Sequence, residues 1–369
     1  MVPKRKKVIY LFPVLAIASF ALTATIRKRA IKNNHLDVPN ERSSHSLPTP
    51  RGAGIAIVAT FFVGLLVLLI NNTISGQDFF TVAAPGLAVA LIGRLDDLGR
   101  VTSAKLRLVG HFICASITVW LAAGLPELPL TNSTIDFGVA GDIAAVVYLV
   151  WMLNLFNFMD GIDLITGIQT FTTCLGTVIL LVVSTDSNLW LLVAMLAAAV
   201  FGFIYFNLPP AKIFLGDVGS GFIGFTIGAI SLVVAKDEPL VAWAMIILLG
   251  VFVTDATVTL LRRLLMREHV YVAHRTHAYQ HLSKKLNRHL PVSLGVGTIN
   301  LFFLLPIAWL VSESVIIPIF GILIAYVPLV IVAVLLKAGK KSNNFFYTNK
   351  RNTPRGFGLI FCEARPNCN

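Results

Sequence analysis

Long apolar stretches alternate with short polar segments along almost the whole chain. An α-helix needs about 20 apolar residues to cross the hydrocarbon core of a membrane. The pattern predicts eleven spans, at residues 8–26, 53–71, 79–93, 106–124, 142–159, 167–183, 189–206, 219–235, 240–260, 293–312 and 314–336. We therefore expect an all-α polytopic membrane protein with about 10–11 transmembrane helices.

Composition supports a membrane protein and excludes several other classes. Of the 369 residues, 56% are hydrophobic and 13% are charged, whereas soluble domains carry about 25% charged residues. A water-soluble fold of this size could not hide so much apolar surface. The sequence is therefore not that of a soluble enzyme, a disordered protein or a disulfide-rich scaffold. The first apolar stretch follows a basic N-terminus, but it is too long for a signal peptide, and we treat it as a retained span.

The positive charges orient the predicted helices. If the connecting segments alternate sides from the N-terminus onward, 25 of the 30 Lys and Arg residues fall on one side and five on the other. This bias places the basic side in the cytosol and the N-terminus on the outer side. The net charge of +12 then reflects topology and contact with anionic membrane lipid. No nucleic-acid partner is expected.

The polar segments that could carry chemistry all fall on the cytosolic side. A site built from several loops at one membrane surface fits an enzyme that acts on a membrane-bound substrate with a cytosolic co-substrate. A transporter or flippase of a phosphorylated or lipid-linked sugar is the alternative. Transporters more often carry ionisable groups near the middle of the membrane, where this chain has almost none.

Two of these segments are rich in carboxylates. Asp96 and Asp97 are adjacent, and neighbouring residues on a helix point about 100° apart, so one would ligate Mg²⁺ while the other acts as a base or binds a second group. The alternative is a capping pair at a helix end. In the second segment, polar residues recur every third position and share one broad helical face. These residues are Asn154, Asn157, Asp160 and Asp163. Buried there, they cost free energy unless partnered; a polar helix end facing water is the alternative.

A third segment runs from Asn207 to Ser220. Asp217 stands at the start of a predicted helix, where it is either an N-cap or a hard oxygen ligand for Mg²⁺. Phe214 could stack on a base, or it could simply anchor the segment in the membrane.

A fourth segment, His274-Arg275-Thr276-His277-Ala278-Tyr279-Gln280-His281, lies in a long basic loop. If it is helical, His274, His277 and His281 share one face. Mixed His and Arg suit pyrophosphate binding; no zinc pattern supports a metal there. The alternative is a solvated basic loop over anionic lipid.

Two weaker features complete the set. The first cytosolic loop is rich in hydroxyl and imidazole groups and contains His45, and Arg51 enters the second span. Asp255, inside the ninth span, is expected to pair with Arg262 or Arg263.

Together and in this order, these segments resemble the polyprenyl-phosphate N-acetylhexosamine-1-phosphate transferase family. The strings "DD", "NxxNFMDGxD" and "FLGDxGS" are specific as a set, and the resemblance runs from about residue 37 to residue 280. The string "AHRTHAYQ" departs from the three-histidine string of the peptidoglycan branch and looks like the branch that initiates O-antigen. Because this loop is thought to face the sugar, the identity of the sugar stays open.

The resemblance implies a reaction and a set of partners. A UDP-N-acetyl sugar and undecaprenyl phosphate would give undecaprenyl-diphospho-sugar and UMP, at the bacterial inner (cytoplasmic) membrane with a periplasmic N-terminus. The reaction would depend on Mg²⁺, with Mn²⁺ as a substitute, and a homodimer is one open state of assembly. We favour direct attack by the lipid phosphate, because a dianionic phosphate is already a nucleophile and needs only alignment.

The resemblance also implies roles for individual residues. Asp217 would hold the metal with Asp97 nearby, and Asp96 would assist or deprotonate the lipid phosphate. The nucleotide would be held by Asn157, Asp160, Asp163, Asn207 and Phe214, and the pyrophosphate or sugar by His274, Arg275 and His277. We thus expect Asp96, Asp97, Asp160 and Asp163 to be catalytic. We expect the substrate-binding residues to be Asn154, Asn157, Asn207, Phe214, His274, Arg275, His277, His45 and Arg51.

The C-terminal segment fits none of these motifs. Residues 338–369 are basic and lack apolar periodicity, which is typical of a disordered cytosolic tail. We expect residues 1–337 to form the membrane transferase domain and this tail to be dispensable for activity.

Overall fold

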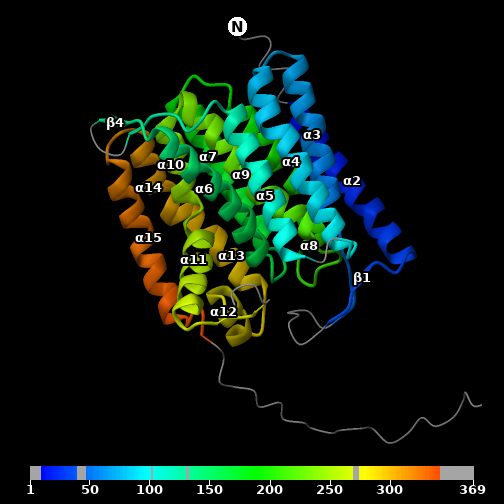
Figure 1. Cartoon of the computed structure of the whole chain (residues 1–369). Coiled ribbons are helices and arrows are strands. Elements are labelled where there is room, and N and C mark those ends of the chain that lie inside the picture. The colour runs from blue at the N-terminus through cyan, green and yellow to red at the C-terminus, as the bar shows by residue number, and fades with distance from the viewer. Residues whose placement is uncertain (1–9, 40–46, 101–102, 130–132, 269–273, 341–369) are drawn as a thin grey trace, which may run out of the picture.

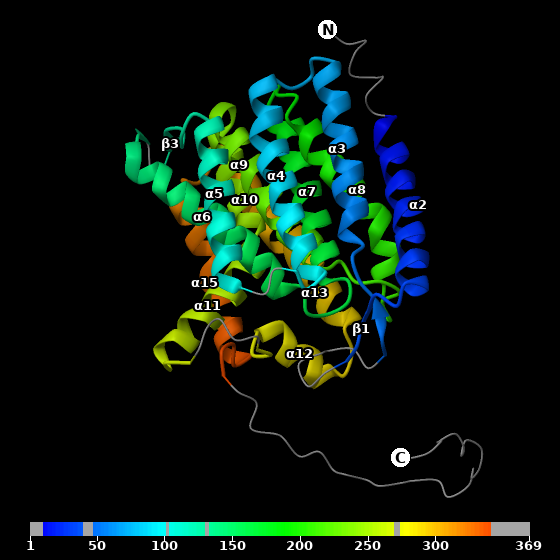
Figure 2. The same cartoon turned by 45° about the vertical axis from the view of Figure 1, so that its right-hand side comes forward.

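A computed structural model describes residues 10–39, 47–100, 103–129, 133–268 and 274–340. Within these ranges the chain is a bundle of helices with two small antiparallel hairpins (Figures 1 and 2). The hairpin strands are β1 Leu36–Asp37, β2 Thr49–Pro50, β3 Leu128–Pro129 and β4 Thr134–Ile135. The helices are α2 Leu11–Lys32, α3 Gly54–Ile70, α4 Gly76–Asp97, α5 Ala104–Leu121, α6 Gly138–Met159, α7 Ile165–Ser184, α8 Trp190–Asn207, α9 Asp217–Asp237, α10 Pro239–Leu248, α11 Gly250–Leu265, α12 Ala278–Leu286, α13 Leu290–Ile299, α14 Leu305–Ser312 and α15 Pro318–Leu335, with a π-helical turn at Asn300–Leu304 between α13 and α14.

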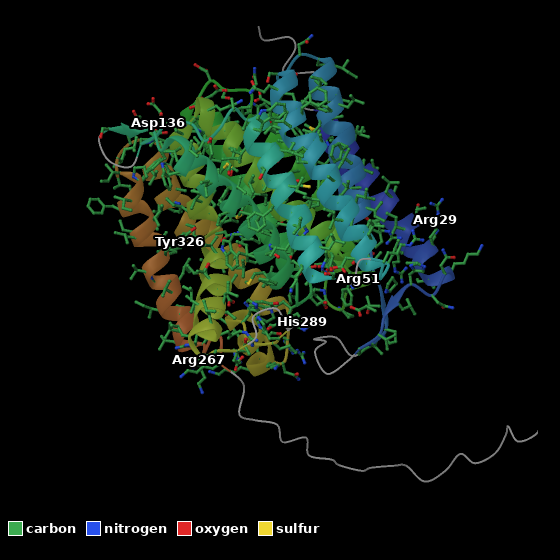
Figure 3. The ribbon with its side chains drawn as sticks, viewed as in Figure 1. Arg29, Arg51, Asp136, Arg267, His289 and Tyr326 are labelled. Carbon is green, nitrogen blue, oxygen red and sulfur yellow. The ribbon has the colours of Figure 1, made fainter. Side chains whose placement is uncertain are left out.

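The described helices confirm the all-α membrane architecture. Eight of them, together with the continuous stretch Leu290–Ser312 that comprises α13, the π-helical turn and α14, are long and apolar enough to cross a membrane. The bent pair α10–α11 makes a tenth span if it counts as one, and α3 is a shorter apolar helix. β1 and α12 lie at one end of the bundle, whereas β3 and β4 lie at the other (Figures 1 and 2). The labelled Arg51, Arg267 and His289 lie toward the first end and Asp136 toward the second (Figure 3). We call the first the site end.

Three predicted spans differ from the observed helices. The span predicted at 8–26 continues to Lys32, and the short span at 79–93 is a helix of 22 residues that carries Asp96 and Asp97 in its last turn. The span predicted at 240–260 is broken by a bend of 62° between α10 and α11. The side-chain amide of Gln169 donates to the Leu248 carbonyl at 3.0 Å, which satisfies a backbone group that the bend frees.

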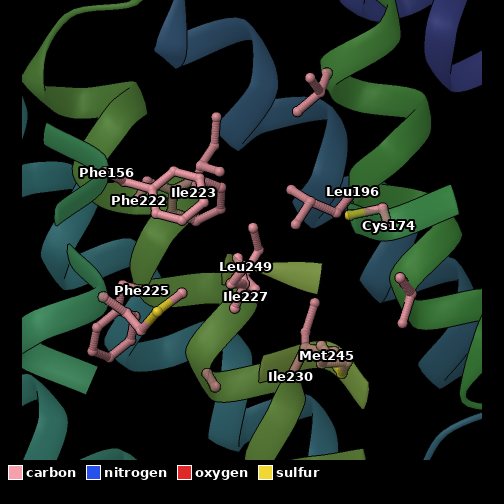
Figure 4. Close-up of a cluster of buried hydrophobic side chains, with 14 of the residues drawn as sticks. Phe156, Cys174, Leu196, Phe222, Ile223, Phe225, Ile227, Ile230, Met245 and Leu249 are labelled. Atoms are coloured by element: carbon pink, nitrogen blue, oxygen red, sulfur yellow. The ribbon is translucent and has the colours of Figure 1, made fainter. Parts of the chain in front are cut away.

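Helix α9 forms the centre of the bundle and is buried from Val218 to Ala235. It packs mainly against α3, α4, α6 and α10, and Figure 4 shows its apolar side chains in a cluster of buried hydrophobic residues. Phe156 of α6 meets Phe252 of α11 edge to face at 5.1 Å. Small residues let the backbones approach, as at membrane helix interfaces generally. A Cβ added to Gly219 of α9 would lie 2.7 Å from the Cα of Gly54 of α3. This packing fixes where the first residue of α9, Asp217, lies.

Candidate active site

A short parallel contact brings the loop after β2 against the loop before α9. The amide of Phe214 donates to the Pro50 carbonyl at 2.8 Å, and the amides of Gly52 and Ala53 donate to the Phe214 carbonyl at 3.1 and 3.0 Å. Arg51 and Phe214 are paired across this contact. Arg51, which the sequence predicts at the entry of a span, therefore lies beside the first turn of α9.

Asp97, the last residue of α4, caps the N-terminus of α9 from a neighbouring helix. Its two carboxylate oxygens accept the backbone N–H groups of Asp217 and Val218 at 2.9 and 3.1 Å. Nε of Arg51 lies 2.9 Å from Oδ1, and the Asp97 side chain is 2% exposed. A carboxylate here is favoured by the helix dipole and satisfies two otherwise unpaired donors. The geometry therefore favours a positioning role for Asp97 over the metal-ligand or catalytic role expected from the sequence.

Asp217 is the carboxylate that faces outward from this cluster. Its Oδ1 accepts from Nη2 of Arg51 at 2.7 Å and from Nδ2 of Asn157 at 3.0 Å. Arg107 of α5 forms an ion pair with Asp96, and its Nη1 lies 3.9 Å from Oδ2 of Asp217. The side chain of Asp217 is 27% exposed. Four helices and one loop thus converge on a carboxylate with one lightly engaged oxygen.

Burial and neighbouring charges shift the pKa values of two residues in this cluster, Arg51 and Asp160. Burial alone would lower the pKa of the Arg51 guanidinium, but the charges of Asp217 and Asp97 outweigh it and raise that pKa. Asp160 follows the last residue of α6, and burial, reinforced by the charge of Asp217, raises its pKa to about 7. A carboxylate that titrates near neutral pH is suited to proton transfer.

A second polar group lies between α7, α8 and α13. Oδ2 of Asp163 accepts the Ala211 amide at 3.1 Å and lies 3.2 Å from Nδ1 of His289. The Asn207 side chain accepts the Leu164 amide at 2.8 Å and donates to the Ile213 carbonyl at 3.2 Å. Both groups of the Asn207 amide therefore hold the backbone of the loops around Asp163 and Phe214.

The segment His274–His277, which we call the histidine loop, precedes α12 rather than forming part of it. His277 is the N-cap of α12, and Gln280 completes a capping box with it. The ring of His274 stacks on that of His277 with centroids 5.0 Å apart. Burial, together with the charges of His277 and Arg263, lowers the pKa of His274 to about 3. His274 is therefore neutral at physiological pH.

Asp255 of α11 holds this loop, contrary to the expected ion pair with Arg262 or Arg263. Its carboxylate accepts the backbone amides of Ala278 and Tyr279, each at 2.9 Å, and lies 3.3 Å from Nδ1 of His277. Asp255 thus caps α12 as Asp97 caps α9. The hydroxyl of Tyr279 in turn donates to the Phe158 carbonyl of α6 at 3.0 Å, which joins the first turn of α12 to the end of α6 that precedes Asp160.

Only some of the residues expected at the site contact one another in the structure. It brings together Asp97, Asn157, Asp217 and Arg51 through direct contacts, and Asp96 joins them through Arg107. Asn154 donates to the Val150 carbonyl of its own helix at 2.7 Å. Arg275 lies half-buried in the histidine loop, and His45 falls outside the described residues. The described part of the chain holds no group of three or more His, Cys, Asp or Glu side chains arranged to hold a metal ion.

Three residues of the site were missed by reasoning from the sequence. Arg107 was counted only for its charge, and His289 stands outside every motif. His111 lies one turn beyond Arg107 on α5, its charged neighbours are Arg107 and Asp217, and its buried Nδ1 has no hydrogen-bond partner in the described structure. The i, i+4 spacing of Arg107 and His111, at the basic end of a predicted span, was the available signal.

The known proteins that this chain is similar to are glycosyl and phospho-sugar transferases. The model of glycosyl transferase family 4 matches residues 79–235, which run from α4 to α9. The chain is 27% identical to a probable undecaprenyl-phosphate N-acetylglucosaminyl 1-phosphate transferase of Bacillus subtilis, over 89% of this chain and 91% of that protein. It is 29% identical to the undecaprenyl-phosphate alpha-N-acetylglucosaminyl 1-phosphate transferase of Thermotoga maritima, over 74% and 81%. A phospho-N-acetylmuramoyl-pentapeptide-transferase of Streptococcus agalactiae is 24% identical over 69% and 77%.

Proposed function

Since the chain belongs to the polyprenyl-phosphate N-acetylhexosamine-1-phosphate transferase family, we propose that it transfers N-acetylhexosamine 1-phosphate from a UDP-sugar to undecaprenyl phosphate. An oxygen of the lipid phosphate bonds to the sugar-bearing phosphorus of the donor. The bond from that phosphorus to the bridging oxygen breaks, and UMP leaves with that oxygen. The products are undecaprenyl-diphospho-sugar and UMP.

The observation that carries this proposal is the arrangement around Asp217. Phosphoryl transfer depends on alignment and on neutralising the charge of the phosphates more than on covalent chemistry by the protein. Arg51 and Arg107 approach Asp217 from opposite oxygens, so two guanidinium groups border the outward-facing carboxylate. Guanidinium groups match phosphate oxygens in geometry and charge.

We assign the divalent cation to Asp217. Mg²⁺ is commonly held by one or two carboxylates together with substrate phosphates, so a site without three protein ligands fits it. Asp217 has a lightly engaged oxygen, whereas both oxygens of Asp97 accept backbone amides. When bound, Mg²⁺ would neutralise charge on the diphosphate. We expect Mn²⁺ to substitute for it.

The remaining residues divide between the two substrates. Arg107 and His111 on α5, with Asp96, border the side on which we place the lipid phosphate. Asn157 positions Asp217 through its amide. Asp163, which accepts the Ala211 amide in the loop of Phe214, and Asp160 are assigned to the nucleotide, with Asp160 exchanging a proton near neutral pH. The histidine loop is assigned to the pyrophosphate or the sugar.

The cellular setting is proposed on the same basis. The basic segments gather at the site end, and positive charge is retained on the cytosolic face of membranes. We therefore place the site end in the cytosol of a bacterial inner membrane, against anionic lipid. The product would feed O-antigen or a related envelope polysaccharide, because the histidine loop resembles that branch.

The experiment is direct. Membranes or purified protein are incubated with undecaprenyl phosphate, Mg²⁺ and a panel of UDP-N-acetyl sugars, and UMP and the mass of the lipid product are measured. We expect one or two sugars to give equal amounts of UMP and lipid diphosphate. Movement of a lipid-linked sugar between leaflets, without UMP release from any donor, would contradict the proposal and support a flippase.

A further inference from the structure

The chain does not leave the bundle where its last helix ends. Helix α15 closes with a turn in which the amide of Lys337 donates to the Val334 carbonyl and that of Ala338 to the Ala333 carbonyl, each at 3.0 Å. Lys337 adopts a left-handed conformation, φ 63°, and Ala338 packs against Ala333. This is the Schellman pattern of helix ends. It turns residues 338–340, which we call the C-terminal clasp, back toward α11 and α12.

The clasp is bound at each of its three residues. The Gly339 amide donates to the Thr276 carbonyl at 2.7 Å. The Ala338 carbonyl accepts from Nη1 of Arg262 at 2.8 Å, and the Lys340 carbonyl lies 3.1 Å from Nε2 of His281. Ala338 is fully buried. These contacts use backbone atoms of the clasp, so they depend on its path more than on its side chains.

Gly339 is required by this path on two counts. Its φ is +78°, a conformation that residues with a Cβ rarely adopt. A Cβ at this position would also lie 2.9 Å from Cβ of Arg262 and 3.0 Å from the Thr259 carbonyl oxygen of α11. Because the backbone of α11 cannot move aside cheaply, a larger residue would push the clasp away from Thr276.

Thr276 lies at the centre of the histidine loop. Its hydroxyl lies 3.0 Å from Nδ1 of His274, and its carbonyl accepts the Gly339 amide. On the other side of the loop, Asp255 holds His277 and the first turn of α12. The loop is therefore fixed from two directions, by a carboxylate of α11 and by the backbone of the clasp.

We propose that the C-terminal clasp is a positioning element for the histidine loop, so that residues after the last span help to bind the donor substrate. This rests on the proposed function, which assigns the loop to the pyrophosphate or sugar of the donor. The clasp touches neither substrate and acts through Thr276 and His281. It therefore affects the binding of the UDP-sugar and leaves the binding of the lipid phosphate unchanged.

The main test is Gly339→Ala in the full chain. We expect the KM for the UDP-sugar to rise about fivefold or more, the effect of losing roughly one net hydrogen bond, while the KM for undecaprenyl phosphate stays within about twofold. The matched control is Gly138→Ala, which also has a positive φ (+50°) but open space around the added Cβ and lies at the other end of the bundle. An unchanged KM for the UDP-sugar in Gly339→Ala would overturn the proposal.

Two further variants separate the individual contacts. His281→Ala removes the bond to the Lys340 carbonyl and should raise the same KM by a smaller factor. Lys285→Ala, on an exposed position of the same helix, should leave it unchanged. Equal effects of both variants would mean that α12 responds to any substitution, which contradicts a specific role for the clasp.

A test by hydrogen exchange does not depend on catalysis. Because the Gly339 amide donates to the Thr276 carbonyl at 2.7 Å, this amide should exchange slowly with solvent in the wild-type protein, as measured by hydrogen–deuterium exchange. Fast exchange of the Gly339 amide would overturn the clasp whatever the activity. Wild-type protein that releases no UMP would overturn the proposed function, and with it the donor role of the clasp, even if this amide is protected.

Discussion

Oδ1 of Asp97 accepts the backbone amide of Asp217 at 2.9 Å, so the residue that ends α4 holds the residue that begins α9. Two acidic motifs that lie 120 positions apart in the sequence thereby meet and have two different roles. Asp97 is buried and fixes the backbone at the start of α9, whereas the carboxylate of Asp217 faces Arg51, Arg107 and solvent. Substitutions at the two positions should therefore fail in different ways.

Asp217→Asn should abolish function without unfolding the protein. We expect UMP release to fall by about 100-fold or more, because a preorganised charge at the phosphates is lost, while the Tm of the purified protein changes little. The control is Asp237→Asn, the last residue of the same helix, which is exposed and lies at its other end. Near-normal turnover of Asp217→Asn at saturating Mg²⁺ would contradict the metal assignment.

Asp97→Ala should destabilise the protein as well as inactivate it. Two buried backbone amides at the start of α9 would lose their acceptor, at a cost of about 1–3 kcal/mol for each unsatisfied group. We expect a lower Tm by thermal unfolding in detergent. An Asp97→Ala protein with wild-type Tm and lost Mg²⁺ dependence would instead make Asp97 a metal ligand.

The pH dependence should report Asp160, whose pKa burial raises to about 7. If the ionised carboxylate is the active form, kcat/KM falls as the pH drops through about 7, and Asp160→Asn removes this limb of the profile. The stability of the folded protein depends on pH in the opposite direction. Because the folded pKa lies above the ordinary value of 3.8, the neutral form favours folding, and its contribution is complete below pH 3.8 and lost as the pH rises through about 7. A pH profile unchanged in Asp160→Asn would exclude this role.

The contact between α3 and α9 should tolerate no side chain at Gly219. A Cβ on Gly219 would lie 2.7 Å from the Cα of Gly54, and overpacking of this kind costs about 1–3 kcal/mol. We expect Gly219→Ala to lower both Tm and activity. Gly295→Ala, where the added Cβ meets open space, is the control and should behave as wild type. Equal Tm values in the two variants would show that the helices separate easily.

Much of the architecture follows from the sequence, because lipid requires long apolar helices whatever their neighbours are. The eleven apolar stretches and the clustering of polar motifs on one side needed no tertiary information. The helix bounds were less accurate. The bend between α10 and α11 was invisible because Leu248 and Leu249 are apolar, and the polar groups that satisfy the freed backbone, Gln169 and Thr173, belong to α7.

The roles within the site depended on the fold. The pattern of residues alone indicates which residue types gather at the basic ends of the spans, because charged groups are too costly inside a membrane to be placed at random. Three contacts are visible only in the folded chain: Asp97 caps α9, Asp255 holds the histidine loop rather than an arginine, and Gly339 of the expected tail contacts Thr276. These pairings join residues more than 20 positions apart, and hydrogen-bond geometry is set by helix packing, which no local pattern records.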